Sequence, residues 1–135
     1  MGKRGPAPSL TEHSPVFRTA DITPPPDLTG AALNHWNENA PALATSGVLT
    51  QVDRTMFEML CRAVAEWRDL EAQITTFTIE RRGAAAKNPV CTLRNQAQAV
   101  VIQLSKEFGL TPVSRGNVTV APADDDSLAD DMGWE

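Results

Sequence analysis

The sequence predicts an all-α protein: a core of about three helices built around a helical hairpin. A disordered basic N-terminal arm and a disordered acidic C-terminal tail are expected to flank this core. Three observations predict it. Apolar residues recur at helical spacing between residues 28 and 110. A helix beginning at residue 88 has recognisable start and stop signals. Both ends of the chain are rich in Pro, Gly or Asp and lack that periodicity.

These patterns divide the chain into a flexible arm (residues 1–27), a helical oligomerisation core (residues 28–115) and an acidic tail (residues 116–135). A length of 135 residues fits one domain with tails. A core of roughly 80 residues is marginally stable alone, so oligomerisation is expected.

The arm is expected to be flexible or extended because it holds six prolines and little periodic apolar sequence. Pro24, Pro25 and Pro26 should stiffen its junction with the core.

A first helix is expected to begin at Thr29 and to end before Gly47. Pro41 either kinks this helix or splits it in two. The apolar face is formed by Leu33, Trp36, Ala40 and Leu43.

A second helix is signalled by Thr50 and Asp53, which resemble a capping box with Asp in place of Glu or Gln. Two interpretations of its end stay open. The helix runs for roughly 28 residues, about 40 Å, or residues 74–79 leave it and become extended, since they are β-branched and aromatic. The apolar face is Phe57, Leu60, Val64, Trp67, Leu70, Ile74 and Phe77.

Residues 80–87 form a connecting loop around Gly83, with a short hairpin tip as the alternative. The third helix follows and packs back on the second. Asn88 caps it, Pro89 fits its first turn, and Gly109 supplies the left-handed residue beyond its end. Thr111 and Pro112 are typical of the start of another short helix, and the apolar face of the third helix is Val90, Leu93, Ala97, Val100, Val101, Leu104 and Phe108.

Charge is segregated along the chain, whose net charge is −5. Residues 81–115 carry six basic side chains and one acidic one, whereas residues 116–135 carry six acidic side chains and no basic one. Such segregation indicates separate basic and acidic contact surfaces.

Enzyme signatures are missing from the sequence. The two histidines, His13 and His35, have no Cys or carboxylate at metal-ligand spacing. There is no phosphate-binding glycine loop and no G-x-S-x-G motif. Asp124 to Asp126 lack the rest of an EF-hand pattern. We therefore predict no catalytic residue, no metal and no cofactor.

Cys61 and Cys91 lie among apolar residues of the expected helices, which indicates two reduced core thiols; a disulfide is the alternative. Neither a signal peptide nor a transmembrane stretch is recognisable, so an intracellular, soluble protein is expected.

Two basic clusters are candidate DNA contacts. Lys3 and Arg4 precede Gly-Pro, as in arms that lie along a DNA minor groove, and Arg18 is a weaker candidate. The second cluster, Arg81, Arg82 and Lys87, is expected at the tip of the helical hairpin, where it would suit phosphates. The alternatives are an arm without a role and a solubilising loop, and a ring of many copies would favour the DNA interpretation through avidity. Structural ion pairs are the alternative for Arg94 and Arg115.

The tail is a candidate docking segment, because it places an aromatic residue among acids. The alternative is an uncommitted end. The candidate partner-binding residues are Asp124, Asp125, Asp126, Asp130, Asp131 and Trp134.

Four groups of residues, taken in order over residues 1–115, resemble the small terminase subunits of tailed bacteriophages and prophages. They are the basic start GKRGPAP, the proline run followed by Trp36, the stretch GVLT-x-x-DR with a later WR, and the stretch from Asn88-Pro89 to FGLTP-x-SR. Pro41 and the single glycine of the loop before Asn88 depart from that family's pattern.

The resemblance implies a subunit without catalytic residues that binds viral double-stranded DNA at the packaging start site. It further implies a homo-oligomeric ring that recruits and regulates the large terminase ATPase–nuclease in the host cell cytoplasm. No membrane and no small-molecule substrate are implied. Two other classes stay open: a helix-turn-helix transcriptional regulator, which needs a short basic recognition helix, and a purely structural helical assembly protein.

Overall fold

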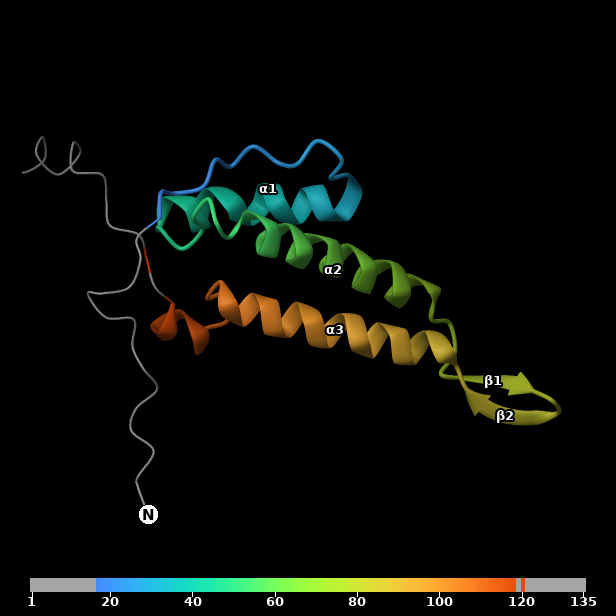
Figure 1. Ribbon diagram of the computed structural model, residues 1–135. Helices are drawn as coiled ribbons and strands as arrows, with labels where there is room; N and C mark the ends of the chain where they lie inside the picture. Colours follow the sequence, from blue (N-terminus) through green and yellow to red (C-terminus); the bar gives the residue numbers. More distant parts are fainter. Residues whose placement is uncertain (1–16, 119, 121–135) are drawn as a thin grey trace, which may run out of the picture.

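The computed structural model describes residues 17–118 and residue 120 (Figure 1). Three helices dominate it: α1 (Gly30–Thr45), α2 (Arg54–Gln73) and α3 (Pro89–Glu107). A two-stranded hairpin of β1 (Thr78–Arg81) and β2 (Ala84–Lys87) separates α2 from α3, and a 3-10 turn, η1 (Ser114–Asn117), follows α3. The predicted three-helix composition is confirmed, and the hairpin is an addition to it.

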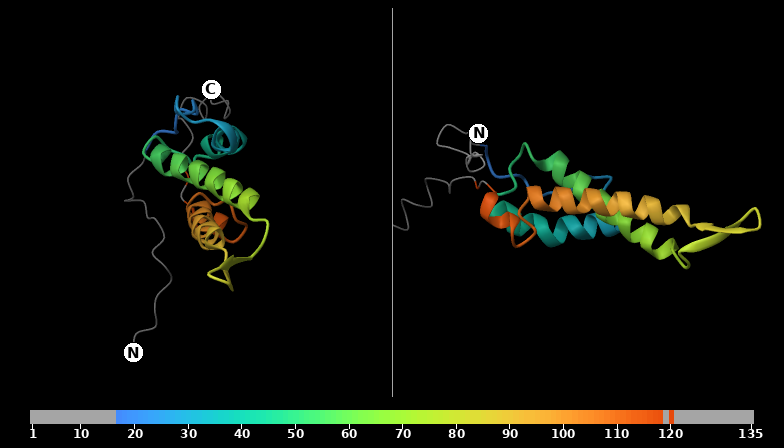
Figure 2. Two further views of the ribbon diagram at one scale, coloured as in Figure 1. Left: turned by 90° about the vertical axis from the view of Figure 1, so that its right-hand side faces the viewer. Right: turned by 90° about the horizontal axis from the view of Figure 1, so that it is seen from below.

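Consecutive helices run antiparallel, and α2 is the central one (Figure 1). It packs against both α1 and α3, so that end-on it lies between them (Figure 2). The α2–α3 pair extends beyond the start of α1, and in that region it is a bare two-helix hairpin (Figure 1).

The α1 helix continues through Pro41 as one helix, so the alternative of two separate helices is wrong. Proline lacks the N–H that would bond to the carbonyl of Asn37, one turn earlier. Both residues are exposed, so water can satisfy that carbonyl. The predicted apolar face is confirmed, because Trp36, Ala40 and Leu43 are buried.

The start of α2 depends on the predicted Thr50–Asp53 pair. The Asp53 carboxylate accepts hydrogen bonds from the backbone N–H of Thr50 (3.1 Å) and from its hydroxyl (2.6 Å). The helix ends at Gln73, so the shorter of the two predicted lengths is correct. The β-branched residues after it leave the helix and lead into β1.

Residues 80–87 form most of an antiparallel β-hairpin, in which Thr78 pairs with Lys87 and Arg81 with Ala84, so the irregular loop is wrong and the alternative of a short hairpin is confirmed. The strand signal was weak because β2 contains three alanines, which have low strand propensity. The two-residue turn also begins with Arg82 in place of the usual Asn, Asp or Gly.

Both ends of α3 have the predicted caps. The Asn88 side chain accepts from the N–H of Val90 (3.0 Å) and donates to the carbonyl of Thr76 (3.0 Å), which ties the helix start to the hairpin base. At the other end, Gly109 has φ +66°, and the N–H of Leu110 donates to the carbonyl of Ser105 (2.9 Å). This pattern is a Schellman motif.

The short helix expected from Thr111 begins later, as the 3-10 turn η1 at Ser114. The hydroxyl groups of Thr111 and Ser114 are hydrogen-bonded to each other (2.6 Å).

The predicted apolar face of α3 is only partly buried. Ala97, Leu104 and Phe108 are buried, whereas Leu93 is 50% and Val100 43% exposed. The reason is that α3 packs extensively only against α2, so a wide apolar face has one helical partner.

The core is densest where all three helices meet. The ring of Phe57 on α2 lies 4.9 Å from that of Trp36 on α1 and 5.4 Å from that of Phe108, just after α3. Both distances are typical of favourable aromatic pairs. Trp67, expected in the core or an interface, is half-buried, and its indole N–H donates to the side chain of Gln98.

The described part of the predicted arm lies along α1 (Figure 1). The N–H of Ala20 donates to the carbonyl of Leu49 (3.0 Å), and the indole N–H of Trp36 donates to the carbonyl of Ile22 (2.8 Å). The Arg54 guanidinium donates to the carbonyls of Asp21 and Thr23, and it lies 5.2 Å from the centre of the Trp36 ring. We call these contacts the Arg54–Trp36 clasp; they attach residues 17–27 to the core.

Gly109→Ala is predicted to lower the free energy of unfolding by about 1–2 kcal/mol, because a left-handed φ is unfavourable for alanine. Its Cβ would also lie 2.7 Å from a methyl carbon of Val118. The matched control is Gly116→Ala, where the added Cβ meets nothing within 4 Å. Urea unfolding followed by circular dichroism measures both, and equal midpoints would contradict the prediction.

Candidate nucleic-acid interface

The hairpin presents three exposed basic side chains, Arg81, Arg82 and Lys87. Arg81 and Lys87 lie at the ends of β1 and β2, and Arg82 begins the turn. None of the three forms an ion pair with an acidic side chain of the described residues. Their charges are therefore available to an external anion.

The hairpin projects from the far end of the α2–α3 pair, beyond the helices (Figures 1 and 2). Within the described chain, its strands pack against each other and make no extensive contact with a helix. The three cations therefore lie at one end of an elongated molecule, with Arg81 and Arg82 near the turn and Lys87 at the base of the hairpin.

Arg18 lies at the opposite end of the molecule. Its carbonyl accepts from the N–H of Gln51 (2.9 Å), just before α2 begins, and its side chain is exposed. The hairpin follows the other end of α2, a helix about 30 Å long. Arg18 and the hairpin cations therefore cannot form one continuous surface on a single chain.

The chain leaves the described region near Val118, whose side chain lies beside Gly109 at the end of α3. Residue 17 and residue 118 are thus at the same end of the molecule, away from the hairpin (Figure 1). Several predicted site residues lie outside the described residues, namely Lys3, Arg4, Asp124, Asp125, Asp126, Asp130, Asp131 and Trp134.

Other basic residues have structural roles. Arg94 forms an ion pair with Glu71 that joins α3 to α2, which confirms the structural alternative for this residue. The guanidinium of Arg115 donates to the carbonyl of Gly109 (3.2 Å). Arg62 pairs with Asp27 at 3.0 Å. These three side chains already bond to other groups of the chain, whereas the hairpin cations form no ion pair among the described residues.

The described residues offer little chemistry for catalysis. Burial lowers the pKa of His35, whose buried Nε2 atom has no hydrogen-bond partner among residues 17–118. Burial raises the pKa of the Cys61 thiol to about 12, so it is not a thiolate nucleophile at neutral pH. Cys61 and Cys91 are both free and buried, which confirms the predicted reduced thiols. No group of His, Cys, Asp or Glu within residues 17–118 could hold a metal ion.

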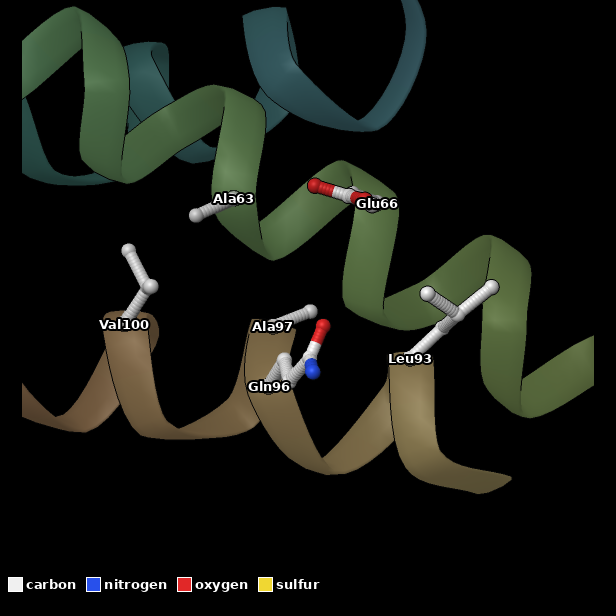
Figure 3. A pocket seen from close by; sticks show the side chains of 6 residues that line it. All are labelled: Ala63, Glu66, Leu93, Gln96, Ala97 and Val100. Carbon is white, nitrogen blue, oxygen red and sulfur yellow. The ribbon is translucent and has the colours of Figure 1, made fainter. Parts of the chain in front are cut away.

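An open groove lies between α2 and α3 (Figure 3). Glu66 is its one ionisable side chain, so it lacks an acid–base pair or a nucleophile. Apolar side chains dominate the rest of the lining, which consists of Ala63, Leu93, Gln96, Ala97 and Val100. Sequence reasoning missed this groove, although the width of the α3 apolar face was a signal for it.

No described helix is both long and apolar enough to cross a membrane. The described helices also lack a helix-turn-helix arrangement, because α2 connects to α3 through the hairpin and no short basic helix follows a tight turn.

The observations define a mostly helical protein with a projecting basic hairpin and an apolar groove. The family model described as phage terminase, small subunit, matches residues 32–125, a span that begins within α1 and includes α2, the hairpin and α3. No curated protein and no solved structure matches the chain. The chain belongs to the phage terminase small-subunit family, as the resemblance predicted. Membership of this family implies a non-catalytic role in phage DNA packaging.

The free energy of unfolding is predicted to fall with acidification below pH 6.5, the ordinary pKa of histidine, because burial lowers the pKa of folded His35. Below pH 6.5, His35 binds a proton in the unfolded chain but stays neutral in the folded chain. The free energy of unfolding is therefore highest above pH 6.5 and falls as the pH drops towards the pKa of folded His35. Urea unfolding between pH 5 and 8 measures this. His35→Gln should flatten the pH dependence, and an unchanged slope in that variant would contradict the prediction.

Proposed function

We propose that this chain binds viral double-stranded DNA at the packaging start site, assembles as a ring, and recruits and regulates the large terminase ATPase–nuclease. The match of the small-subunit family to residues 32–125 carries the proposal. The exposed basic hairpin supports its DNA-binding part, and the host cell cytoplasm is the proposed location.

The ring is supported by apolar side chains left in water around the α2–α3 groove. Leu93 and Val100 of α3 line the groove and are 50% and 43% exposed. Met56 and Met59 of α2 are 42% and 49% exposed and stand at helical spacing from the groove residue Ala63, so they continue its α2 side. Contiguous exposed apolar surface is typical of protein interfaces. A head-to-tail arrangement of copies through this groove gives a ring when the rotation between neighbouring subunits closes.

A ring of such subunits would have two different rims. All hairpins would lie at one rim and residues 17 and 118 of every subunit at the other, since these occupy opposite ends of each subunit. Repetition would gather the hairpin cations into a belt, and avidity would compensate for weak binding by one copy.

The proposed DNA contacts are the hairpin residues, together with Arg18, Lys3 and Arg4 of the arm. Arg81, Arg82 and Lys87 are the best supported, because they are exposed and unpaired within the described chain. Arg18 would contact DNA from the rim that carries residues 17 and 118.

The tail is the proposed contact for the large subunit. Its acids and tryptophan offer a charged, aromatic docking segment. The proposed residues are Asp124, Asp125, Asp126, Asp130, Asp131 and Trp134. The proposed domain organisation is the predicted one, with an arm to residue 27, a core to residue 115 and a tail to residue 135.

Native mass spectrometry is predicted to find a closed ring of many copies. Val100→Glu should reduce it to small species, because the carboxylate would be buried in the groove interface. Ile102→Glu is the matched control: this α3 residue is 45% exposed, close to the 43% of Val100, but does not line the groove. A wild-type monomer or dimer would contradict the ring, and an unchanged Val100→Glu ring would contradict the interface.

Deleting residues 121–135 is predicted to abolish stimulation of the large-subunit ATPase and to leave the ring and its DNA binding intact. The truncation removes the six acids of the tail and keeps Val118 beside Gly109. ATPase assays with the truncated and the full-length chain measure the effect. Equal stimulation by both would show that the large subunit binds elsewhere.

A further inference from the structure

The β1–β2 hairpin contributes no side chain to the hydrophobic core cluster. Of its side chains, only Ile79 and Ala86 are half-buried, and the others are exposed. A two-stranded ribbon of this length is at best marginally stable in water. Core packing therefore does not explain why the chain extends here when a short turn would connect α2 to α3.

The turn places a long cation in an unfavourable conformation. Arg82 has φ +54° and Gly83 has φ +79°, and positive φ at both central residues is the type I′ pattern. Arg82 is the one residue other than glycine with positive φ in the described chain. Asn or Gly would adopt this conformation more readily, so stability of the turn does not account for arginine at the tip.

The register places the other two cations on opposite faces of the ribbon. Side chains alternate between faces along a strand, and paired residues share a face. Lys87 pairs with Thr78 and shares the face of Glu80, whereas Arg81 pairs with Ala84 and lies on the other face. The ribbon thus has a cation on each face and one at the tip.

This arrangement matches the major groove of double-stranded DNA. That groove is about 12 Å wide and admits a two-stranded ribbon, whereas the minor groove is only about 6 Å wide. The three alanines of β2 keep one strand of the ribbon thin. A ribbon that enters tip first has a phosphate strand on either side and base edges ahead of it.

We propose that the hairpin enters the major groove tip first, with Arg82 at the edge of a guanine and Arg81 and Lys87 against phosphates of the two strands. Arginine is the usual partner of guanine, because its two donors match the O6 and N7 acceptors. The proposal rests on the proposed DNA-binding function and adds the element, the groove and a separate role for each cation.

The hairpin acts in this readout without Arg18 of the same subunit. Arg18 lies at the other end of α2, a helix about 30 Å long, whereas a major groove is about 12 Å wide. Arg18 therefore contributes affinity elsewhere on the duplex, and the discrimination between sequences depends on Arg82.

The test uses the full-length protein and a randomised duplex library. Sequences enriched by the wild-type protein give a preferred duplex, and a scrambled version gives the reference. A third duplex carries 7-deazaguanine, which lacks the N7 acceptor in the major groove and leaves the phosphates unchanged. Binding of the wild-type protein should favour the preferred duplex over both others.

Two variants of Arg82 separate charge from readout. Arg82→Asn removes the cation and suits the type I′ turn, so the hairpin stays folded. Arg82→Lys keeps the charge but lacks the planar fork of donors. Both should lose about tenfold or more of the preference for the selected duplex. Only Arg82→Asn should also reduce the salt dependence of binding.

The remaining cations serve as comparisons. Arg81→Ala and Lys87→Ala should weaken binding to the preferred and scrambled duplexes equally and reduce the salt slope. Lys106→Ala removes one exposed charge near the other end of α3 and should change neither the preference nor the slope substantially.

The outcomes are distinguishable from failure of the proposed function. If Arg82→Asn keeps the wild-type preference, or if 7-deazaguanine leaves wild-type binding unchanged, the hairpin does not read the major groove although the protein binds DNA. If the wild-type protein binds no duplex at all, the proposed DNA-binding function fails, and this inference fails with it.

Discussion

The structure depends on the aromatic contact among Trp36, Phe57 and Phe108, which joins all three helices at one end. Each ring comes from a different helix or its immediate end, so removing any of them would open the junction of the three. The Trp36 ring also takes part in the Arg54–Trp36 clasp, through its N–H and its face. The same side chain therefore holds the N-terminal segment in place.

Because the three-helix core lies at one end, the other end of the molecule has fewer packing contacts. Beyond α1, contacts between α2 and α3 hold the hairpin base in position, including the ion pair of Arg94 with Glu71 and the bond of Trp67 to Gln98. The Asn88 side chain adds a bond from the start of α3 to the carbonyl of Thr76, between α2 and β1. These contacts are polar and partly exposed, while apolar side chains around the groove stay in water. A neighbouring subunit against the groove would supply the burial that the isolated chain lacks.

The two ends of the molecule differ in chemistry as well as in packing. Residues 17 and 118, where the chain leaves the described region, lie at one end with the aromatic core, and the basic hairpin lies at the other. A protein with a net charge of −5 can thus present a local positive end, because Arg81, Arg82 and Lys87 are exposed and form no ion pair among the described residues.

The sequence by itself determined the elements whose signals are local. Asn88 and Gly109 marked the ends of α3, Thr50 and Asp53 marked the start of α2, and helical periodicity predicted the helices, because caps and periodic faces depend on residues close in the chain. Only the tertiary structure decided which apolar side chains of α3 are buried and which are exposed, since burial depends on how many helices pack against α3. The hairpin register, which sets Arg81 and Lys87 on opposite faces, was likewise decided by the tertiary structure. Alanines and a turn arginine give only a weak strand signal, and the pairing becomes definite only once α2 and α3 hold both strand ends together.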